Sequence, residues 1–571
     1  MVQQQYDVVI VGAGADGPVV AWRLGAAGLD VLLLEAGPFH GNERWPNPHQ
    51  EPGGERSSAI DDLSGTLLDE QFTKREMEMI EKLLWGPADH ERGSWPRKYP
   101  GDGIVLQAAG VGGTSLMYAG NYPRAYPAAI DEQPHWPDTF SYEELIPYYQ
   151  RIEKMTNVSP APITAKEELF FRGAEAAGWD LIDEKNVTSP GYRPQPNAIT
   201  EPDEKLHVSK EYGGDFTYPD VTGDTLGLAE VVGNPHPIDA PFEEKAKRAS
   251  NVAFVPPALK TNHVTVRPNA FVTDVLTETP LGDTPTATGV EFRDTWSGDT
   301  QRVHGEVVVL AAGAIETPRL WLNTGLPDNG WVGKGLTHHL LDGVIGLWTE
   351  RDLEQRIGTK TVDQYMGQFS GGRFDYPGLG MLQPTGSPPG FGTYIGFGAS
   401  RSGFAFMNDS AAAPWDTMGR IAGTRLKRML SDYRRMLPLF ILTDDRPKQS
   451  NGITVAPGIT DEHGPIPQIN YVPSEADRKR RDRLAEIGAR ILREAGADHV
   501  HRSDAPPMGI HLHSTMAMGK VLDNACEAFD VDRLFVADHS ALANGVGGVN
   551  PTNTGQALAL HTADEIKRRY F

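Results

Sequence analysis

The alternation of apolar and polar positions is most regular near the start of the chain. Val8–Val11 is a short apolar run of the kind that forms a buried parallel strand. An Ala- and Leu-rich helical pattern then continues to about Gly28, and a second apolar run occupies Val31–Leu34. A strand, a helix and a strand in this order predict a βαβ unit at the beginning of a parallel sheet.

Three glycines between the first strand and the helix form a GxGxxG pattern. Gly12 permits a tight turn, Gly14 allows close approach of a pyrophosphate, and Gly17 allows the helix to pack on the strand. The helix N-terminus then offers free N–H groups to the phosphates. Glu35 ends the second strand, where its carboxylate is placed to accept hydrogen bonds from a ribose diol. The segment therefore predicts a dinucleotide site.

Helical patterns recur further along the chain. In the segment 141–156, Ser141 and Glu144 have the spacing of a capping box. In the segment 474–495, Leu484, Ile487, Ile491 and Leu492 form an apolar stripe, and the basic run 478–483 is expected to be its solvated face. Helices are also predicted over residues 74–84, 163–179 and 554–569.

Strand patterns return in the second half. Residues 264–278, 287–296 and 305–314 predict a meander that leads back to a buried strand. Thr317-Pro318 has the form of a helix start, with Thr as N-cap and Pro at the first helical position. Alternation in the segments 343–350 and 392–399 indicates a sheet with one buried face. One more buried strand is expected in RLFVADHS, before the closing helix.

This order predicts an α/β protein in which one cofactor domain is interrupted by a second domain. We assign residues 1–125, 251–340 and 511–571 to a discontinuous Rossmann-like cofactor domain. Residues 126–250 and 341–510 are assigned to a substrate-binding domain with an antiparallel sheet. Residues 183–250 are irregular in composition and are expected to form an insertion, either a lid or a contact in a homo-oligomer.

Composition narrows the class of protein. A chain of 571 residues is too long for one core, and its net charge of −23 argues against nucleic acid and anionic membrane surfaces as partners. The single cysteine, Cys526, excludes an intramolecular disulfide and a CxxC metal site. With no apolar run of transmembrane length and no leader pattern, we expect a cytoplasmic protein without a membrane segment.

Four motifs together resemble the GMC (glucose–methanol–choline) oxidoreductase family. The first is GAGADG with Glu35, the second is GVGGTSLMYAGNYPR at 110–124, and the third is GAIETPRLWLNTG at 313–325. The fourth extends from GIHLHSTMAMG to NPTNTGQALALHTADEI, residues 509–566. The resemblance implies an FAD-dependent enzyme that oxidises an alcohol by hydride transfer to flavin N5. It also implies the GMC fold, in which a substrate-binding domain interrupts the FAD-binding domain.

The loop of the second motif departs from the usual family pattern. Tyr118 stands where an asparagine is common, which is more similar to the pyranose-oxidase branch. That branch can attach its flavin covalently through a histidine at the position that matches Met117. Because a thioether is too weak a nucleophile for this linkage, we predict non-covalent FAD. The same resemblance favours sugars or glycosides as substrates over other alcohols.

The resemblance also selects the catalytic residues. A base of near-neutral pKa must take the hydroxyl proton, and histidine is suited to this. Of His511 and His513, we expect only one to face the flavin, and the family pattern selects His511, four residues before Thr515. His513 is then structural. Asn550 matches a family position that holds the substrate oxygen.

The remaining cofactor contacts are carried over residue by residue. Asp538 matches a position near the ribityl and phosphate chain, and it is followed by His539, where a small residue is more usual. Val272 matches a backbone contact to adenine. Further contacts with the cofactor are expected from Gly112, Gly113, Ser115, Gly313, Pro551 and Thr552.

Several alternatives stay open. The electron acceptor is O2 or a quinone-like molecule, and the sequence does not choose between them. An FAD-containing lyase of hydroxynitrile-lyase type, an NAD-dependent dehydrogenase and a non-catalytic binding protein are the rival functions. His338-His339 either lines the substrate pocket or, as we favour, is structural. We expect no metal site, because His511-x-His513 has no third ligand at metal spacing.

Overall fold

The computed structural model describes most of the chain. The described residues are 5–37, 39, 97–98, 104–105, 107–116, 118–160, 163–198, 248–279, 284–295, 297–339, 341–364, 369–386, 422–503 and 508–571. The predicted helix over 74–84, the strand over 392–399 and most of the 183–250 segment lie outside them.

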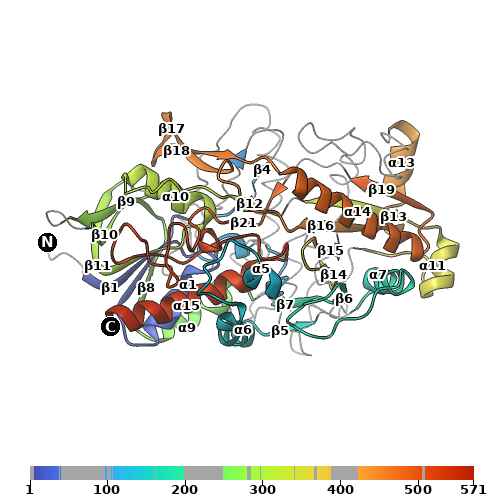
Figure 1. Cartoon of the computed structure of the whole chain (residues 1–571), viewed down its shortest axis with the longest axis horizontal. Coiled ribbons are helices and arrows are strands. Elements are labelled where there is room, and N and C mark those ends of the chain that lie inside the picture. Colours follow the sequence, from blue (N-terminus) through green and yellow to red (C-terminus); the bar gives the residue numbers. More distant parts are fainter. Residues whose placement is uncertain are drawn as a thin grey trace, which may run out of the picture.

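A seven-stranded sheet at one end of the molecule contains the predicted βαβ unit (Figure 1). Strand β1 (Gln5–Val11) pairs in parallel with β2 (Val31–Leu34) on one side and with β11 (Thr300–Leu310) on the other. Strand β22 (Leu534–Val536) pairs in parallel with the end of β11. Segments from the start, middle and end of the chain therefore finish at the same edge of this sheet.

The predicted meander is shorter than expected. Strands β9 (Ala270–Glu278), β10 (Thr286–Asp294) and β11 are antiparallel neighbours, as predicted. The segment before them forms a separate strand, β8 (Val264–Arg267), which pairs in parallel with β2. The strand pattern is interrupted by Pro268 and by Asn269, whose φ is 57°. The two parts of the pattern therefore form separate strands, β8 and β9, at opposite edges of the sheet.

Helices α1 (Gly17–Gly25) and α15 (Thr552–Tyr570) pack beside each other against this sheet. The predicted helix start at Thr317-Pro318 is wrong, because α10 spans Gly313–Thr324 and contains both residues. Pro318 cannot donate to the carbonyl of Ala314, one turn earlier. The hydroxyl of Thr515 donates to that carbonyl at 2.8 Å instead, so the helix tolerates the proline.

A six-stranded antiparallel sheet forms the other end of the molecule (Figure 1). Its order is β19 (His499–Ser503), β13 (Asp342–Leu347), β16 (Met436–Thr443), β15 (Gly380–Pro384), β14 (Gly372–Tyr376) and β6 (Gly191–Pro194). Helices α14 (Glu475–Glu494) and α7 (Ala165–Ala176) pack against it. Strand β6 corrects the expectation that the 183–250 segment is irregular from its start. The domain boundaries given above stay a prediction.

The predicted face of α14 is the buried one. Leu484, Ile487, Ile491 and Leu492 are all buried, as their spacing predicts. The basic run is not wholly solvated, because Arg481 is also buried and lies 3.6 Å from the Asp342 carboxylate. A buried guanidinium is tolerated there because a carboxylate accompanies it.

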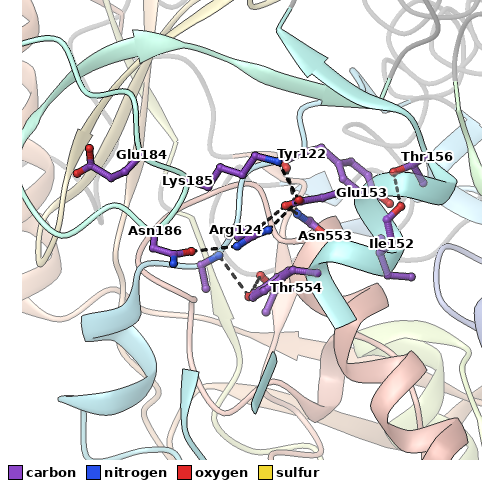
Figure 2. Close-up of polar contacts among 12 residues, drawn as sticks. Tyr122, Arg124, Ile152, Glu153, Thr156, Glu184, Lys185, Asn186, Asn553 and Thr554 are labelled. Atoms are coloured by element: carbon purple, nitrogen blue, oxygen red, sulfur yellow. Dashed lines mark hydrogen bonds and ion pairs between the residues drawn. The ribbon is translucent and has the colours of Figure 1, made fainter. Parts of the chain in front are cut away.

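Helix α6 (Tyr142–Met155) has the predicted capping box and is joined to the start of α15 by a polar cluster. Arg124 donates to both carboxylate oxygens of Glu153 at 2.7 and 2.8 Å (Figure 2). Asn553 in the first turn of α15 donates to the same carboxylate at 3.3 Å, and Lys185 does so at 3.2 Å. The cluster therefore fixes the helix that follows Asn550.

Smaller elements complete the described structure. They are β3 (Arg97–Lys98), β4 (Ile104–Val105), α5 (Pro127–Asp131), β5 (Val158–Pro160), β7 (Pro196–Ala198), α8 (Ser250–Ala253), α9 (Val255–Lys260), β12 (Thr337–His338), α11 (Glu350–Ile357), α13 (Gly423–Ser431), β17 (Gly452–Asp461), β18 (Gly464–Asn470), β20 (Met508–Gly509) and β21 (Leu512–His513). Within the described ranges, every helix is too short or too polar to span a bilayer.

Candidate active site

A cavity of about 320 Å³ opens where the parallel strands end. Val11 and Leu34, the last residues of β1 and β2, lie in its wall, together with Ala311 after β11 and Asp538 after β22. The carboxyl edge of a parallel sheet is where open α/β folds bind nucleotides. From there the cavity extends to residues of the six-stranded sheet, including Gln383 and Phe440.

Close backbone contacts shape the part of the cavity beside the sheet. Gly12 has φ of 103°, and a Cβ on it would lie 2.4 Å from the carbonyl oxygen of Ala311. A Cβ on Gly17 would lie 2.0 Å from the carbonyl oxygen of Gly12, which explains why helix and strand can meet there. In contrast, a Cβ on Gly14 would have no neighbour within 4 Å, and Gly14 lines the cavity. The backbone at Gly14 is thus open to a ligand.

Helices α1, α10 and α15 all begin at the cavity wall. Asp16, Gly313 and Thr552, at or next to their first turns, line it. Helix N-termini present unpaired N–H groups and a positive dipole end. Converging helix starts of this kind suit a ligand with a negatively charged diphosphate.

Glu35 is held by the backbone around it. Its carboxylate accepts from the N–H groups of Ala13 at 2.8 Å and of Gly37 and Gly110 at 2.9 Å. Burial raises its pKa to about 7, and these backbone donors oppose that rise. Glu35 thus joins the glycine turn to the loop at Gly110 and also lines the cavity, where Oε2, which accepts only from Ala13 among these donors, has a further lone pair.

The loop of the GVGGTS motif closes over the glycine turn. A Cβ on Gly113 would lie 2.6 Å from the Cα of Gly14, so the two loops are in direct contact. Ser115 donates to the carbonyl of Gly112 at 2.6 Å and accepts from the N–H of Ser250 at 3.1 Å. Tyr118 lines the cavity beyond this turn. Met117, on which the prediction of non-covalent FAD depends, lies outside the described residues.

Two histidines form a hydrogen-bonded chain at the far part of the cavity. Nδ1 of His511 and Nδ1 of His339 are 2.9 Å apart, and Nε2 of His339 lies 2.9 Å from the carbonyl oxygen of Gly545. A carbonyl only accepts, so Nε2 of His339 carries a proton. Burial lowers the pKa of His339 to about 3, so the ring is neutral near pH 7 and its Nδ1 accepts. His511 must then donate through Nδ1, which leaves Nε2 as its unprotonated nitrogen.

His511 and His513 occupy different environments. His511 lines the cavity, whereas His513 is completely buried and is not part of its wall. Residues two apart in a regular strand would share a face. Strand β21 begins only at Leu512, and His513 is followed by Ser514 with φ of 70°, so the regular alternation does not apply.

Neither His338 nor His339 lines the cavity, and of the two it is His339 that contacts His511. The His338 ring is buried against Tyr471, and the backbone N–H of His338 donates to the Asp445 carboxylate at 2.9 Å. This supports the structural reading for His338. His339 is also absent from the cavity wall, yet it holds His511 directly.

Asn550 lines the cavity and is fixed by a second amide. Nε2 of Gln383 donates to Oδ1 of Asn550 at 2.7 Å, and both residues are buried. The carboxamide of Asn550 therefore has its oxygen occupied and its NH2 group free to donate to a ligand. Gln383 belongs to β15 of the six-stranded sheet, so the two halves of the molecule meet at this contact.

The cavity wall around these polar groups is apolar. Phe369 and Phe440 lie with ring centroids 6.0 Å apart in an edge-to-face arrangement. Leu341 and Leu442 extend the same wall. Such a surface favours a ligand with a small apolar body and a few hydroxyl groups.

Comparison with known proteins identifies the family of this chain. Two family models described as GMC oxidoreductase match residues 236–341 and 447–559. The chain belongs to the GMC oxidoreductase family. A 2-methyl-1,2-propanediol dehydrogenase of Mycolicibacterium austroafricanum is 28% identical over 99% of this chain and 96% of the relative. A paromamine 6'-oxidase of Streptomyces fradiae is 24% identical over 98% of the chain and 91% of the relative.

A solved structure shows the same fold. A mutated formate oxidase of Aspergillus oryzae RIB40 superimposes with a TM-score of 0.59 at 13% identity, covering 100% of this chain and 99% of that one. This GMC oxidoreductase therefore has the predicted FAD-binding fold with a substrate-binding sheet. It is an FAD-dependent oxidoreductase that acts on CH–OH donors, so FAD and not NAD is its cofactor.

The described residues of this GMC oxidoreductase fit FAD. The open backbone at Gly14, the converging helix starts and the Glu35 carboxylate would hold the adenosine diphosphate part. Of the predicted site residues, only Gly17 and Gly112 do not line the cavity, and both shape its turns instead. The others line it: Gly12, Gly14, Glu35, Gly113, Ser115, Val272, Gly313, His511, Asp538, His539, Asn550, Pro551 and Thr552.

Sequence reasoning missed several residues of this site. His339 and Gln383 hold the two predicted catalytic residues. Phe271 and His463 stack with ring centroids 3.7 Å apart in the wall beside Val272, where the resemblance places adenine. No sequence pattern indicates a cofactor contact for His463, because it lies in the turn between β17 and β18, remote in sequence from every cofactor motif. Within the described ranges, no cluster of three or more His, Cys, Asp or Glu residues is arranged to hold a metal ion.

Proposed function

We propose that the chain oxidises a small aliphatic alcohol, with His511 as the general base and Asn550 as the group that orients the substrate oxygen. The observation that carries this proposal is the chain from the Gly545 carbonyl through His339 to His511. It fixes His511 in the tautomer whose Nε2 has no proton. When bound, FAD accepts the hydride that leaves the carbinol carbon.

The base works by taking the hydroxyl proton onto Nε2 of His511. Burial lowers the pKa of His511 well below its ordinary value, and His339 lowers it further. The imidazole is therefore neutral before the reaction, as a base must be. Nδ1 keeps its hydrogen bond to His339 throughout, so that the ring does not turn away.

Asn550 complements the base from the other side of the cavity. With its oxygen bonded to Gln383, its NH2 group donates to the substrate oxygen and stabilises the negative charge that develops there. Because the hydrogen bond from Gln383 in β15 holds Asn550, which lies just before α15, the donor is fixed before the substrate binds. A preorganised donor costs little reorganisation during the reaction.

The apolar wall supports the substrate class. Leu341, Phe369, Phe440 and Leu442 match an aliphatic body better than the many hydroxyl groups of a sugar. The amide oxygen of Gln383 gives a second hydroxyl an acceptor, so a branched 1,2-diol suits the site. A relative in this family acts, by its name, on 2-methyl-1,2-propanediol. Sugars and glycosides, which the loop at Tyr118 favours, are the second candidate.

A panel of alcohols tests the proposal. Purified protein is mixed without oxygen with linear alcohols, branched 1,2-diols, aryl alcohols and sugars, and bleaching of the flavin absorbance is followed. We expect the fastest bleaching with small branched diols and peroxide formation on readmission of air if O2 is the acceptor. Bleaching by sugars alone would overturn the substrate class. A flavin that stays yellow with every alcohol would indicate the lyase, which the comparisons do not support.

A further inference from the structure

Two titratable residues lie beside each other in the wall of the cofactor cavity. Asp16 lies at the N-cap of α1 but makes no side-chain cap hydrogen bond. His539 follows Asp538 after β22, and its Nε2 lies 3.6 Å from the Asp16 carboxylate. Both residues line the cavity. Oδ1 of Asp16 and Nε2 of His539 are buried without a hydrogen-bond partner in the protein.

The surrounding backbone makes room for this pair. A Cβ on Gly555 in the first turn of α15 would lie 2.1 Å from Cδ2 of His539 and 3.2 Å from Oδ1 of Asp16. A glycine is therefore needed at this position for the imidazole to reach the carboxylate. Residues from α1, from the segment after β22 and from α15 thus combine to build one small polar pocket.

Asp16 creates an electrostatic difficulty in a diphosphate site. The N-terminus of α1, with Gly14 and the N–H groups beyond it, is where the FAD diphosphate would bind. A bare carboxylate there repels the phosphates, since Asp16 is only 4% exposed and water does not screen it. Asp538 is a second carboxylate nearby, although the N–H of Gly313 and the hydroxyl of Thr317 already satisfy it.

We propose that Asp16 and His539 act as a pair that holds one proton in total, so that the pair presents no net charge to the FAD diphosphate and the cofactor binds tightly. The pair is a determinant of cofactor retention. It does not depend on which alcohol the enzyme oxidises. It needs only FAD as the cofactor.

The other titratable groups around His539 do not supply this proton. The His513 ring lies 6.0 Å away, and His339 and His511 are hydrogen-bonded to each other. Burial lowers the pKa of each of these three rings, so they are neutral near pH 7. Burial also lowers the pKa of His539 to about 4, and burial and Asp538 raise that of Asp16. These directions place the proton on the Asp16 carboxyl, and the neutral His539 ring faces it at 3.6 Å with an Nε2 that has no other partner.

A double-mutant cycle on FAD affinity tests the proposal. FAD is removed, and the Kd for its return is measured by quenching of flavin fluorescence in wild type, H539Q, D16N and the double variant. We expect H539Q to weaken FAD binding by about ten- to hundred-fold, because it removes the basic nitrogen that faces the protonated Asp16 carboxyl and so favours ionised Asp16 beside the phosphates. D16N should bind FAD at least as well as wild type, and the double variant should recover most of the loss.

Controls separate charge from folding. His263 and Asp30 form an exposed pair 3.0 Å apart away from the cavity, and H263Q should leave the Kd unchanged. Unfolding of each apoprotein is followed by circular dichroism, so that a loss of fold is recognised; in that case H539A and H539A/D16A are compared instead. A double variant as weak as H539Q, or an H539Q protein with wild-type affinity, would overturn the proposal.

Discussion

His339 holds His511 through their Nδ1 atoms, which lie 2.9 Å apart. Two neutral imidazoles can share this bond only if one donates and the other accepts. The carbonyl of Gly545 fixes the direction of this bond, because it requires a proton on Nε2 of His339. Nδ1 of His339 is then the acceptor and Nδ1 of His511 the donor. A backbone carbonyl that does not line the cavity thus determines which nitrogen of His511 is basic.

Replacing His339 should therefore reduce the chemical step and leave FAD bound. In H339L, His511 loses the partner that selects its tautomer, and we expect kcat to fall by about 100-fold or more. The matched control is H501L, since His501 is buried in β19 and does not line the cavity. Steady-state rates and bound flavin per protein are measured. An H339L enzyme as active as H501L would show that the contact has no catalytic role.

The pH dependence should show an unusually acidic base. Burial lowers the pKa of His511 well below 6.5, and only the neutral ring accepts the proton. As the pH falls, kcat/KM should therefore stay constant through 6.5 and decrease only in more acidic solution, where Nε2 becomes protonated. The profile of kcat/KM between about pH 4.5 and 8.5, about 2 pH units on either side of the ordinary histidine pKa, checks this. An acid limb at or above 6.5 would mean another base.

Gln383 should contribute to catalysis only through Asn550. Q383L frees the Asn550 amide to rotate, and we expect kcat to fall by about ten-fold, less than the loss typical of removing the donor itself. N550A should cost about 100-fold or more. If the two residues act as a unit, the double variant is no slower than N550A. Additive losses would instead give Gln383 a separate contact with the substrate.

The polar cluster around Glu153 should support the stability of the fold. R124A leaves the buried Glu153 carboxylate with only Lys185 and Asn553, and we expect a loss of about 3 kcal/mol in the free energy of unfolding. The control is R172A, whose exposed pair with Glu168 is worth about 0.3–0.5 kcal/mol. Chemical denaturation of both variants measures the difference, and equal losses would contradict the account.

The same carboxylate predicts a pH effect on stability. Arg124 and Lys185 hold the pKa of Glu153 below its ordinary value, against the effect of burial. A group with a lowered folded-state pKa stabilises the protein above its unfolded pKa and loses this contribution as the pH falls. The stability difference between wild type and R124A should therefore shrink in acid, below about pH 4.3.

Elements with a local signal could be predicted from the sequence. The βαβ unit, the capping box at Ser141 and the stripe on α14 depend on residues a few positions apart, and the structure confirms them. The predicted start of α10 was wrong, because the true start depends on contacts with residues remote in sequence. Thr317 donates to Asp538, and Thr515 satisfies the carbonyl that Pro318 leaves free.

The candidate site shows the same limit. Residues in family motifs, such as His511 and Asn550, could be placed by resemblance, and they line one cavity as predicted. Gln383 and His339 carry no motif that marks their role, because that role is a single contact with a residue more than a hundred positions away. Such contacts exist only once the two sheets are assembled.

The rate at which an alcohol reduces the bound flavin in H511A tests the central claim most directly. Rapid mixing without oxygen follows the flavin absorbance in H511A and wild type with the best alcohol from the panel. We predict that H511A stays yellow with FAD bound and is reduced about 10²- to 10⁴-fold more slowly, the usual contribution of a general base. Reduction within a few-fold of the wild-type rate would contradict the assignment of His511 as the base.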